Sequence, residues 1–565
     1  MRLNLTKFTL LGCACAVSAF AQLTVDQRIA DFQQLVGLYV KNYGPYEWKR
    51  DALKFDLFKT APWIDRIKAA KDDLDFYEVM VDYVANMNDA HDNYNLPSSF
   101  VASLGFSVDI YDGKVLVDSI NRTRLPAASF PFQIGDELIS ADGKSAEQLL
   151  QDFSKYSIFA NPRSTRRQAA ARITTRPQSR MPHAVDLGDN ATVVIGRQSG
   201  STETYTIPWL KTGLPLRVIG PVPLPQGASP QADIANPIGN EADYMAPLRR
   251  LQNCMVTEPY GILNFGGRSP IFNPPPGFQM RLGRVPSDVF FSGTFKAGGY
   301  NIGFIRIPDY APNDSNAALN QFFGEIAYFQ ANTDGLIVDE MRNPGGSVLY
   351  VNQIAQLLIP YTFRSIAFEV RATPDWIVSI SSSLVQAKAQ GAPQWILDEL
   401  QVIFDQLKQA NSENRGRTGP LPLSYSRIDI DPFTDNLGSP IAYTKPLMVL
   451  VDELSASGGD AFPATIQDNQ RGPLFGMRTM GAGGNVVSTT IGAYSEGVTS
   501  LTESLMNRKN PIVTAEYPTA PYVENIGVRP EIVNDYMTKD NLLTGGRPFV
   551  DAFTAAMVDW IKKNQ

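Results

Sequence analysis

The stretch MVLVDELSASGGDAFPATIQD, residues 448–468, joins an apolar run to a segment with the character of a helix. Residues 448–451 are uniformly apolar, which is typical of a strand buried on both faces. Two serines and several small residues lie at the corner where the helix is predicted to begin. Backbone N–H groups at a helix N-terminus are unpaired and stabilise negative charge, so a hydroxyl there is well placed to attack a carbonyl. The local pattern leaves open that Ser455 or Ser457 only caps the helix.

The totals of the chain indicate a multidomain protein whose main partners are not nucleic acids. It has 565 residues, several times the usual size of a domain, of which 44% are hydrophobic and 19% are charged. Its formal net charge is -7, whereas a surface that binds nucleic acid is basic. We therefore expect neutral, cationic or peptidic substrates.

The N-terminus has the pattern of a secretory signal peptide. A basic start and an apolar stretch, 8–17, precede a small-residue cleavage site that ends at Ala21. Residues 1–21 are therefore predicted to be removed and the protein to be secreted or periplasmic. The alternative is a lipoprotein cut before Cys13, which would leave a very short apolar region. No later run approaches the ~18 apolar residues of a transmembrane helix.

The cysteines and histidines exclude several kinds of chemistry. Cys13 and Cys15 lie in the predicted signal, so Cys254 is alone in the mature chain and is expected to be a buried hydrophobic residue. Two isolated histidines and one cysteine cannot form a zinc set without several carboxylates, and neither HExxH nor GxxxxGK[ST] occurs. We expect no metal and no cofactor.

Periodicity and composition divide the mature chain into four segments. The first has apolar spacings of three and four, the second a period of two, the third many Pro and Gly residues, and the fourth strands that alternate with helices. The predicted segments are an N-terminal helical domain over 22–98, a β-rich domain over 99–215, a connector with short ordered pieces over 216–298, and an α/β domain over 299–565. The fold class is thus multidomain α/β, with crossover connections in the last segment.

The β-rich segment resembles a PDZ domain. GDELI, from Gly135 to Ile139, and the DGK that follows at 142–144 match the pattern GD.I...DG, and SLGF at 103–106 resembles the carboxylate-binding loop. The resemblance implies a domain that captures extended peptides by strand addition. An insertion at about 155–188 departs from the family, and a sheet without a ligand is the alternative.

Six arginines fall within this insertion, between Arg163 and Arg180, with no acidic residue among them. Such a run predicts a solvated or protease-sensitive loop, and a patch that binds anions is the alternative.

The α/β segment resembles the tail-specific and tricorn serine peptidase family. The resemblance rests on SAS followed by QD on the next helix, on the strand motif G.RT.G in GMRTMG, and on DEMRNPGG at 339–346. It covers about 300–540 and implies a ClpP/crotonase-like α/β core with Ser457 as the nucleophile. The tail-specific branch uses a lysine base, but the position where that lysine is expected is Ala482.

The other members of the site also follow from the resemblance. The tricorn-like and CPAF-like branches take a histidine from the segment before the PDZ-like domain, which implies His91 as the general base rather than His183. They take a glutamate from a segment near the C-terminus, which implies that Glu524 orients the histidine, with Glu516 as the alternative. The implied oxyanion donors are the N–H of Gly458 and one from Gly345 or Gly346.

Together these patterns predict a secreted serine endopeptidase that hydrolyses peptide bonds through an acyl-enzyme. Its partners would be polypeptide substrates, with no nucleic acid and no integral membrane segment after signal removal. The resemblance also implies a homodimer and an inhibitory segment within the connector that the enzyme itself cleaves. The alternative is an inactive protein that binds peptides or hydrophobic ligands on the same scaffold.

Overall fold

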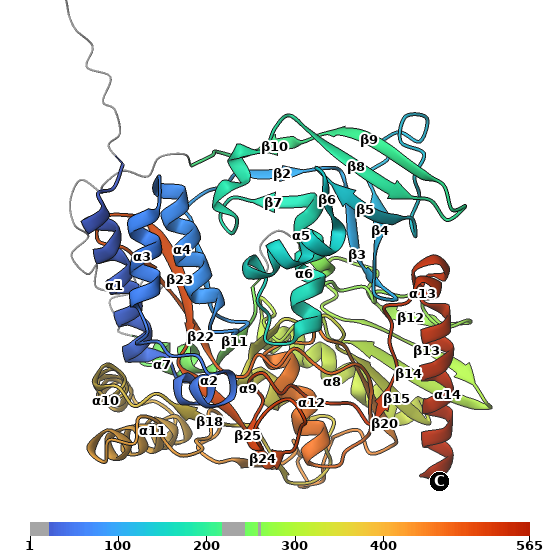
Figure 1. Cartoon of the computed structure of the whole chain (residues 1–565). Helices are drawn as coiled ribbons and strands as arrows, with labels where there is room; N and C mark the ends of the chain where they lie inside the picture. Colours follow the sequence, from blue (N-terminus) through green and yellow to red (C-terminus); the bar gives the residue numbers. More distant parts are fainter. Residues whose placement is uncertain (1–21, 217–242, 258–260, 565) are drawn as a thin grey trace, which may run out of the picture.

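The structure, a computed structural model, describes residues 22–216, 243–257 and 261–564 (Figure 1). The predicted signal peptide, 1–21, and the alternative lipoprotein cysteine, Cys13, lie outside these residues. Within the three described stretches, no helix has both the length and the apolar character needed to span a membrane.

Four helices form the N-terminal region, as the apolar spacing predicts. They are α1 (Val25–Asn42), α2 (Tyr46–Leu53), α3 (Ala61–Ala69) and α4 (Asp73–Ala85). Thr24 and Gln27 form a capping box at the start of α1, and the Asp72 side chain caps α4 by accepting from the N–H of Asp75. After α4 a short turn leads into β1 (Asn93–Asn95) and carries His91.

The PDZ-like region is built on an antiparallel sheet of order β3-β4-β5-β8-β9, with β6 beside β5. Its strands are β3 (Phe106–Tyr111), β4 (Lys114–Ile120), β5 (Glu137–Ala141), β6 (Lys144–Ser145), β8 (Asn190–Gly196) and β9 (Thr202–Pro208). A smaller sheet of order β10-β2-β7 contains β2 (Val101–Ser103), β7 (Thr175–Pro177) and β10 (Leu210–Thr212). Asp112 and Gly113 both have positive φ at the turn from β3 to β4, as the Asp-Gly pair predicts.

The arginine-rich insertion is a helix and not a solvated loop, so the sequence prediction for it is wrong. After α5 (Ala146–Phe153) and a short 3-10 turn (Ser154–Tyr156), the run forms α6 (Pro162–Thr174), and a second 3-10 turn (Pro182–Asp186) follows β7. Arg167 and Arg172 on α6 are each only 1% exposed. The prediction failed because the acidic residues that neutralise Arg163 and Arg167 come from segments far away in the sequence.

The main sheet of the α/β region has the order β12-β13-β14-β15-β20-β21-β26. Its strands are β12 (Gln279–Leu282), β13 (Phe291–Ala297), β14 (Tyr300–Arg306), β15 (Gly335–Asp339), β20 (Leu447–Val451), β21 (Leu474–Gly476) and β26 (Ile532–Val533). Strands β14, β15, β20, β21 and β26 run parallel to one another. The pairs β12–β13 and β13–β14 are antiparallel. The predicted α/β layer with crossovers is present.

Alternate residues of these strands face two different cores, because successive side chains point to opposite faces of a sheet. One core contains Leu336 and Val449 together with α8 (Ser315–Asn332), α9 (Val348–Gln356) and α12 (Gly458–Asp468). The other contains Ile337 and Met448 together with α14 (Arg547–Lys563), the long red helix in Figure 1. Helices therefore cover both faces, which explains the uniformly apolar run of β20.

The sheet begins inside the segment that the sequence assigns to the connector, because β12 and β13 both precede residue 299. The same segment contains α7 (Ala246–Gln252), β11 (Asn253–Met255) and a short 3-10 turn (Ile262–Asn264). Clusters of Pro and Gly flank β12, as in NPPPG at 273–277, and they hide the short alternation of the strand between them.

The remaining elements of the α/β region lie outside the main sheet. They are β16 (Gly345–Ser347), β17 (Phe363–Arg364), β18 (Ala367–Val370), α10 (Pro374–Ala389), α11 (Gln394–Ser412), β19 (Asp429–Ile430), β22 (Val486–Ile491), β23 (Gly497–Thr502), β24 (Ser504–Ile512), β25 (Ala520–Tyr522) and α13 (Lys539–Thr544). β23 pairs antiparallel with β1, and so the C-terminal part of the chain contacts the segment that carries His91 (Figure 1).

Candidate active site

Ser457 lies at a sharp turn between β20 and α12. Its backbone has φ 60° and ψ -108°, a conformation that an L-residue adopts at a cost, and its side chain is fully buried. The N–H of Ser457 donates to the carboxylate of Asp460 at 2.7 Å, three residues further along the helix. Strained corners of this kind present a nucleophile at the end of a strand.

Asp460 also ties this corner to the loop at 479–482. Its carboxylate accepts from the Thr479 hydroxyl and from the N–H groups of Gly481 and Ala482, the latter two at 2.9 Å. Burial raises the pKa of Asp460 to about 6, although these donors act in the opposite direction. Ala482, the position of the lysine in the tail-specific branch, therefore contributes only its backbone.

Ser455 has a structural role. Its hydroxyl donates to the carbonyl of Glu340 at 3.0 Å and accepts from the N–H of Asp452 at 3.1 Å. These contacts hold the loop after β20 against the end of β15.

The glycines of DEMRNPGG lie directly beside the nucleophile. A methyl group added at Gly345 would lie 2.6 Å from the N of Gly458, and one added at Gly458 would lie 2.9 Å from the N of Gly346. Only glycine allows the two loops to approach so closely. Asn343 fixes their spacing, because its carbonyl accepts from Ala456 at 2.8 Å and its side chain accepts from Gly345 at 2.8 Å.

His91 meets Ser457 although 366 residues separate them in the chain. The Nε2 of His91 lies 2.7 Å from the Oγ of Ser457, and both side chains are buried. The β1–β23 pairing brings them together, supported by the N–H of Thr502, which donates to Asp92 at 2.9 Å. Such a contact is the nucleophile–base geometry that acyl transfer requires.

Asp89 is the carboxylate beside the histidine. Its Oδ1 accepts from the N–H of His91 at 3.0 Å and lies 3.9 Å from the Nδ1 of the ring. The hydroxyl of Tyr43 donates to its other oxygen at 2.9 Å. Burial lowers the pKa of His91 to about 4; Asp89 raises it in part, and Lys49 lowers it further.

Glu524 lies in the same buried network but does not touch the imidazole. Its carboxylate forms an ion pair with Lys49 of α2 and accepts from the N–H of Gly483 at 2.7 Å. Lys49 also donates to the side chain of Asn525 at 2.8 Å. Burial and the charge of Asp89 raise the pKa of Glu524, while Lys49 opposes them. The described residues provide no hydrogen-bond partner for the Nδ1 of His91, so Glu524 is not hydrogen-bonded to this ring.

The alternative residues lie in other surroundings. The side chain of Glu516 is half exposed and pairs with Arg529 at 3.0 Å. His183 contacts Asp186 at 2.8 Å and Asp75 at 3.2 Å. Asp72, Asp75 and His183 are a group of possible metal ligands within the described residues, and all three are partly exposed. Of the predicted residues, His91 lies beside Ser457, whereas Glu524, predicted to orient His91, contacts Lys49 and Gly483 and not the imidazole.

A strand of the connector lies across residues 342–346, which we call the glycine loop. β11 pairs antiparallel with β16, with Cys254 opposite Gly346, and the N–H of Val256 donates to the carbonyl of Pro344 at 2.9 Å. β11 therefore lies along the strand that contains Gly346. Cys254 is fully buried, as predicted, and burial raises the pKa of its thiol.

The fold and the site together define the class of the protein as a serine-type peptidase. Residues 301–511 match the model of peptidase family S41, and residues 101–215 match a model of the PDZ domain. The chain thus carries a PDZ domain followed in the sequence by a family S41 peptidase domain. The predicted enzyme class and the multidomain fold are both confirmed.

The chain is similar over nearly its whole length to relatives and to solved structures of the same fold. A protein of Chlamydia trachomatis serovar D is 26% identical over 607 residues, which cover 98% of this chain and 96% of that protein. A protein of Chlamydia pneumoniae is 24% identical over 619 residues, which cover 100% and 95%. The crystal structure of mature CPAF superposes with a TM-score of 0.72 at 22% identity, over 95% of this chain and 98% of that chain. A structure of mature CPAF complexed with lactacystin gives 0.73 at 22% identity, over 95% and 99%.

Sequence reasoning missed four residues of the site: Lys49, Asp89, Asn343 and Asp460. Two of them leave a local signal, since Asp89 lies two residues before His91 and Asp460 occupies the acidic position of a capping pattern that starts at Ser457. Asn343 lies inside a motif that was noted only for its glycines. Nothing in the sequence around Lys49 shows that it pairs with Glu524.

Proposed function

We propose that the protein is a secreted serine endopeptidase in which Ser457 is the nucleophile and His91 the general base. The observation that carries this proposal is the 2.7 Å contact between the Nε2 of His91 and the Oγ of Ser457 in a buried setting. The glycine loop beside Ser457 supports it, because acyl transfer needs donors at the carbonyl oxygen.

The reaction proceeds in two halves. The Oγ of Ser457 attacks the scissile carbonyl carbon while Nε2 of His91 takes the hydroxyl proton, and the oxyanion receives N–H groups from Gly458 and Gly346. His91 then returns the proton to the leaving amine, which leaves an ester on Ser457. Water, deprotonated by His91, hydrolyses that ester. Gly345 is the weaker oxyanion candidate, because its N–H already donates to Asn343 at 2.8 Å.

The neighbouring charges make this proton transfer feasible. The imidazolium that forms during the reaction is stabilised by Asp89 and opposed by Lys49. Glu524 pairs with Lys49 and so reduces the repulsion. In this proposal Asp89 stabilises the protonated ring directly, while Glu524 acts by neutralising the lysine.

A fluorophosphonate probe tests the nucleophile, because such probes label only activated serines. We expect labelling at Ser457, none in Ser457→Ala, and loss of labelling and peptide hydrolysis in His91→Ala. His183→Ala is the matched control, since it removes the other histidine, and it should react like the wild type. If His91→Ala were labelled at the wild-type rate, the proposed base would be wrong.

The connector is proposed to inhibit the enzyme until it is displaced. Support comes from β11, which lies on the glycine loop, and from Val256, which packs in a cluster with the residues next to the base and the nucleophile, Ala90 and Ala456. A substrate strand and β11 would compete for the edge of β16, which contains Gly346. The inhibition therefore acts at the proposed oxyanion donor.

Weakening this strand should activate the enzyme. We expect Val256→Asp to raise the labelling rate of Ser457, because a buried carboxylate destabilises the docked strand. Val285→Asp is the control, since Val285 lies in the same connector and is 48% exposed. Equal labelling of Val256→Asp and the wild type would contradict the inhibitory role.

Export through residues 1–21 and assembly as a homodimer belong to the same proposal and rest on the sequence resemblance. N-terminal sequencing of exported protein should find a start near Gln22. Sedimentation of the processed protein should give twice the chain mass.

A further inference from the structure

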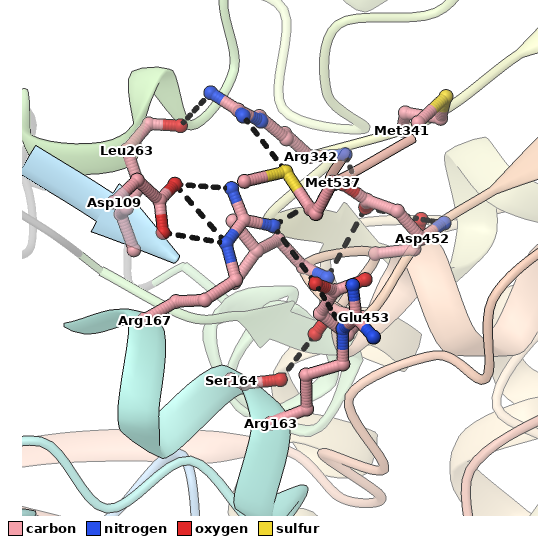
Figure 2. Close-up of polar contacts among 12 residues, drawn as sticks. Asp109, Arg163, Ser164, Arg167, Leu263, Met341, Arg342, Asp452, Glu453 and Met537 are labelled. Carbon is pink, nitrogen blue, oxygen red and sulfur yellow. Dashed lines mark hydrogen bonds and ion pairs between the residues drawn. The ribbon is translucent and has the colours of Figure 1, made fainter. Parts of the chain in front are cut away.

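A network of polar contacts with a buried centre joins the PDZ domain to the loop that carries Ser457 (Figure 2). Arg163 and Arg167 of α6 take part with their guanidinium groups, and Arg342 of the glycine loop takes part with its backbone N–H. The partners are four carboxylates, which are Asp109, Asp452, Glu453 and Asp535. None of these residues belongs to the catalytic set described above.

Arg167 lies at the centre of this network and is 1% exposed. Its Nε and Nη2 donate hydrogen bonds to the carboxylate of Asp109 on β3, at 3.0 and 2.6 Å. Its Nη1 donates to Glu453 at 3.1 Å and lies 3.9 Å from Asp452. One guanidinium thus bridges the PDZ sheet and the segment four residues before Ser457, as Figure 2 shows.

The nucleophile loop has further contacts with α6. The Nε of Arg163 donates to the Glu453 carboxylate at 2.7 Å, and the Ser164 hydroxyl donates to the Glu453 carbonyl. Burial raises the pKa of Glu453, but Arg167 and Arg163 outweigh it, so the pKa is lowered and the carboxylate stays ionised. The main chain at this residue is therefore held from two sides.

The network also reaches the glycine loop. Asp452 accepts from the N–H of Arg342 at 2.8 Å and from the N–H of Leu454 at 3.1 Å. Arg342 immediately precedes Asn343, which fixes Gly345 and Ala456. A displacement of Asp452 and Glu453 would thus move both the nucleophile and the oxyanion donors.

The PDZ end of the link lies on an edge strand. β3 is the first strand of its sheet, and the N–H of Ile110 on this strand donates to the Asp109 side chain at 2.7 Å. In the loop that resembles a carboxylate-binding loop, the N–H of Leu104 donates to the carbonyl of Thr174 on α6 at 3.0 Å. Helix α6 and the Asp109 side chain thus accept hydrogen bonds from the backbone N–H groups of Leu104 and Ile110, which a bound peptide would use.

From these contacts we infer that Arg167 is a positioning residue that couples the PDZ sheet to the loops of Ser457 and Gly346. Asp109 acts through Arg167 and touches neither loop itself. The guanidinium fork suits this task because it satisfies carboxylates in two directions with fixed geometry. The inference rests on the proposed peptidase function of Ser457.

The test compares Arg167→Met and Asp109→Asn with a neighbour on the same helix. Arg166→Met is the matched control, because the Arg166 side chain is 43% exposed and pairs with Glu147, which is 55% exposed. Each variant is assayed for kcat and KM on a peptide substrate, for the fraction of active sites by titration, and for the rate of fluorophosphonate labelling. Rates are expressed per titrated site, so that a loss of folded protein does not count as a loss of positioning.

We expect kcat of Arg167→Met to fall by about 10- to 100-fold, because small displacements of reacting groups have effects of that size. KM should change by less than about threefold, since substrate contacts are not removed. Asp109→Asn should lower kcat by about three- to tenfold although it lies on the PDZ sheet, and the double variant should match Arg167→Met, because coupled residues are non-additive. Arg166→Met should match the wild type. Arg167→Lys, which keeps the charge without the fork, should fall between the wild type and Arg167→Met.

Three results would overturn the inference: wild-type kcat per site in Arg167→Met or Arg167→Lys, an effect of Asp109→Asn confined to thermal stability, or losses that add in the double variant. The failure of the proposed function is distinguishable from these. In that case the wild-type chain itself would not be labelled at Ser457, whereas a failure of this inference alone leaves the wild type and the variants equally labelled.

Discussion

Glu524→Gln separates the charge of Glu524 from its hydrogen bonding. Lys49 and Glu524 both have side chains that are 0% exposed, and the ammonium also donates to Asn525 and to the carbonyl of Asn88. Glutamine can still accept from the N–H of Gly483, so the substitution removes mainly the negative charge. It leaves a buried lysine without a counter-charge beside a histidine that must become positive during the reaction.

The size of the effect follows from this burial. Removing one partner of a buried ion pair costs about 3–5 kcal/mol, so the free energy of unfolding should fall by about that amount. The uncompensated ammonium should also weaken His91 as a base, and each tenfold weakening corresponds to about 1.4 kcal/mol. We expect kcat/KM to fall by at least about a hundredfold, which is two such steps.

The double variant Lys49→Met with Glu524→Gln provides the control. It removes both charges, and replacing a buried ion pair by well-packed uncharged groups of similar volume is often neutral or stabilising, by about 1–4 kcal/mol. Chemical denaturation and steady-state hydrolysis measure the two effects. The reasoning is refuted if Glu524→Gln keeps its stability within ~1 kcal/mol, or if the double variant recovers neither stability nor kcat/KM.

Three further predictions concern the same site. Burial lowers the pKa of His91 to about 4 in the folded protein, below its ordinary value near 6.5, so kcat/KM should stay high down to about pH 5 and fall as the pH drops through 4. The folding stability linked to this group should be complete above pH 6.5 and should decline as the pH falls toward 4. A pH profile of kcat/KM with an acid limb near 6.5 would contradict this. Gly346→Ala should abolish labelling of Ser457, because the new methyl group would lie 2.1 Å from the carbonyl carbon of Tyr310 at a φ of 145°, and labelling at the wild-type rate would exclude the glycine loop from the site. Asp460→Asn should lower the free energy of unfolding by about 1–3 kcal/mol and slow labelling, because one acceptor oxygen cannot serve four donors; unchanged denaturation and labelling would count against its anchoring role.

Much of the site was accessible from the sequence because its signals are local. The apolar strand, the serine at the helix start and the two glycines after Asn343 are each contained within a few residues, so a motif can present them. The chain has only two histidines, so few residues had to be considered as the base before His91 was chosen. The structure then placed its Nε2 at 2.7 Å from Ser457.

The missing parts are pairings between distant segments. Lys49 and Glu524 are 475 residues apart, and neither stands in a pattern that predicts the other. The arginines of α6 looked like a solvated run because their acids, such as Asp109 and Glu453, lie 58 and 286 residues away. Periodicity describes which face of an element is buried, but it does not describe which element covers that face.

The sequence by itself determined the amphipathic N-terminal helices, the alternation of the α/β sheet and the serine at the end of β20, since each follows from local spacing and backbone chemistry. Only the tertiary structure decided that Asp89 and not Glu524 lies beside the imidazole, that β11 covers the glycine loop, and that Arg167 connects two domains. The physical reason is that a buried charge is stable only with a partner, and the partner is chosen by the packing of the whole chain.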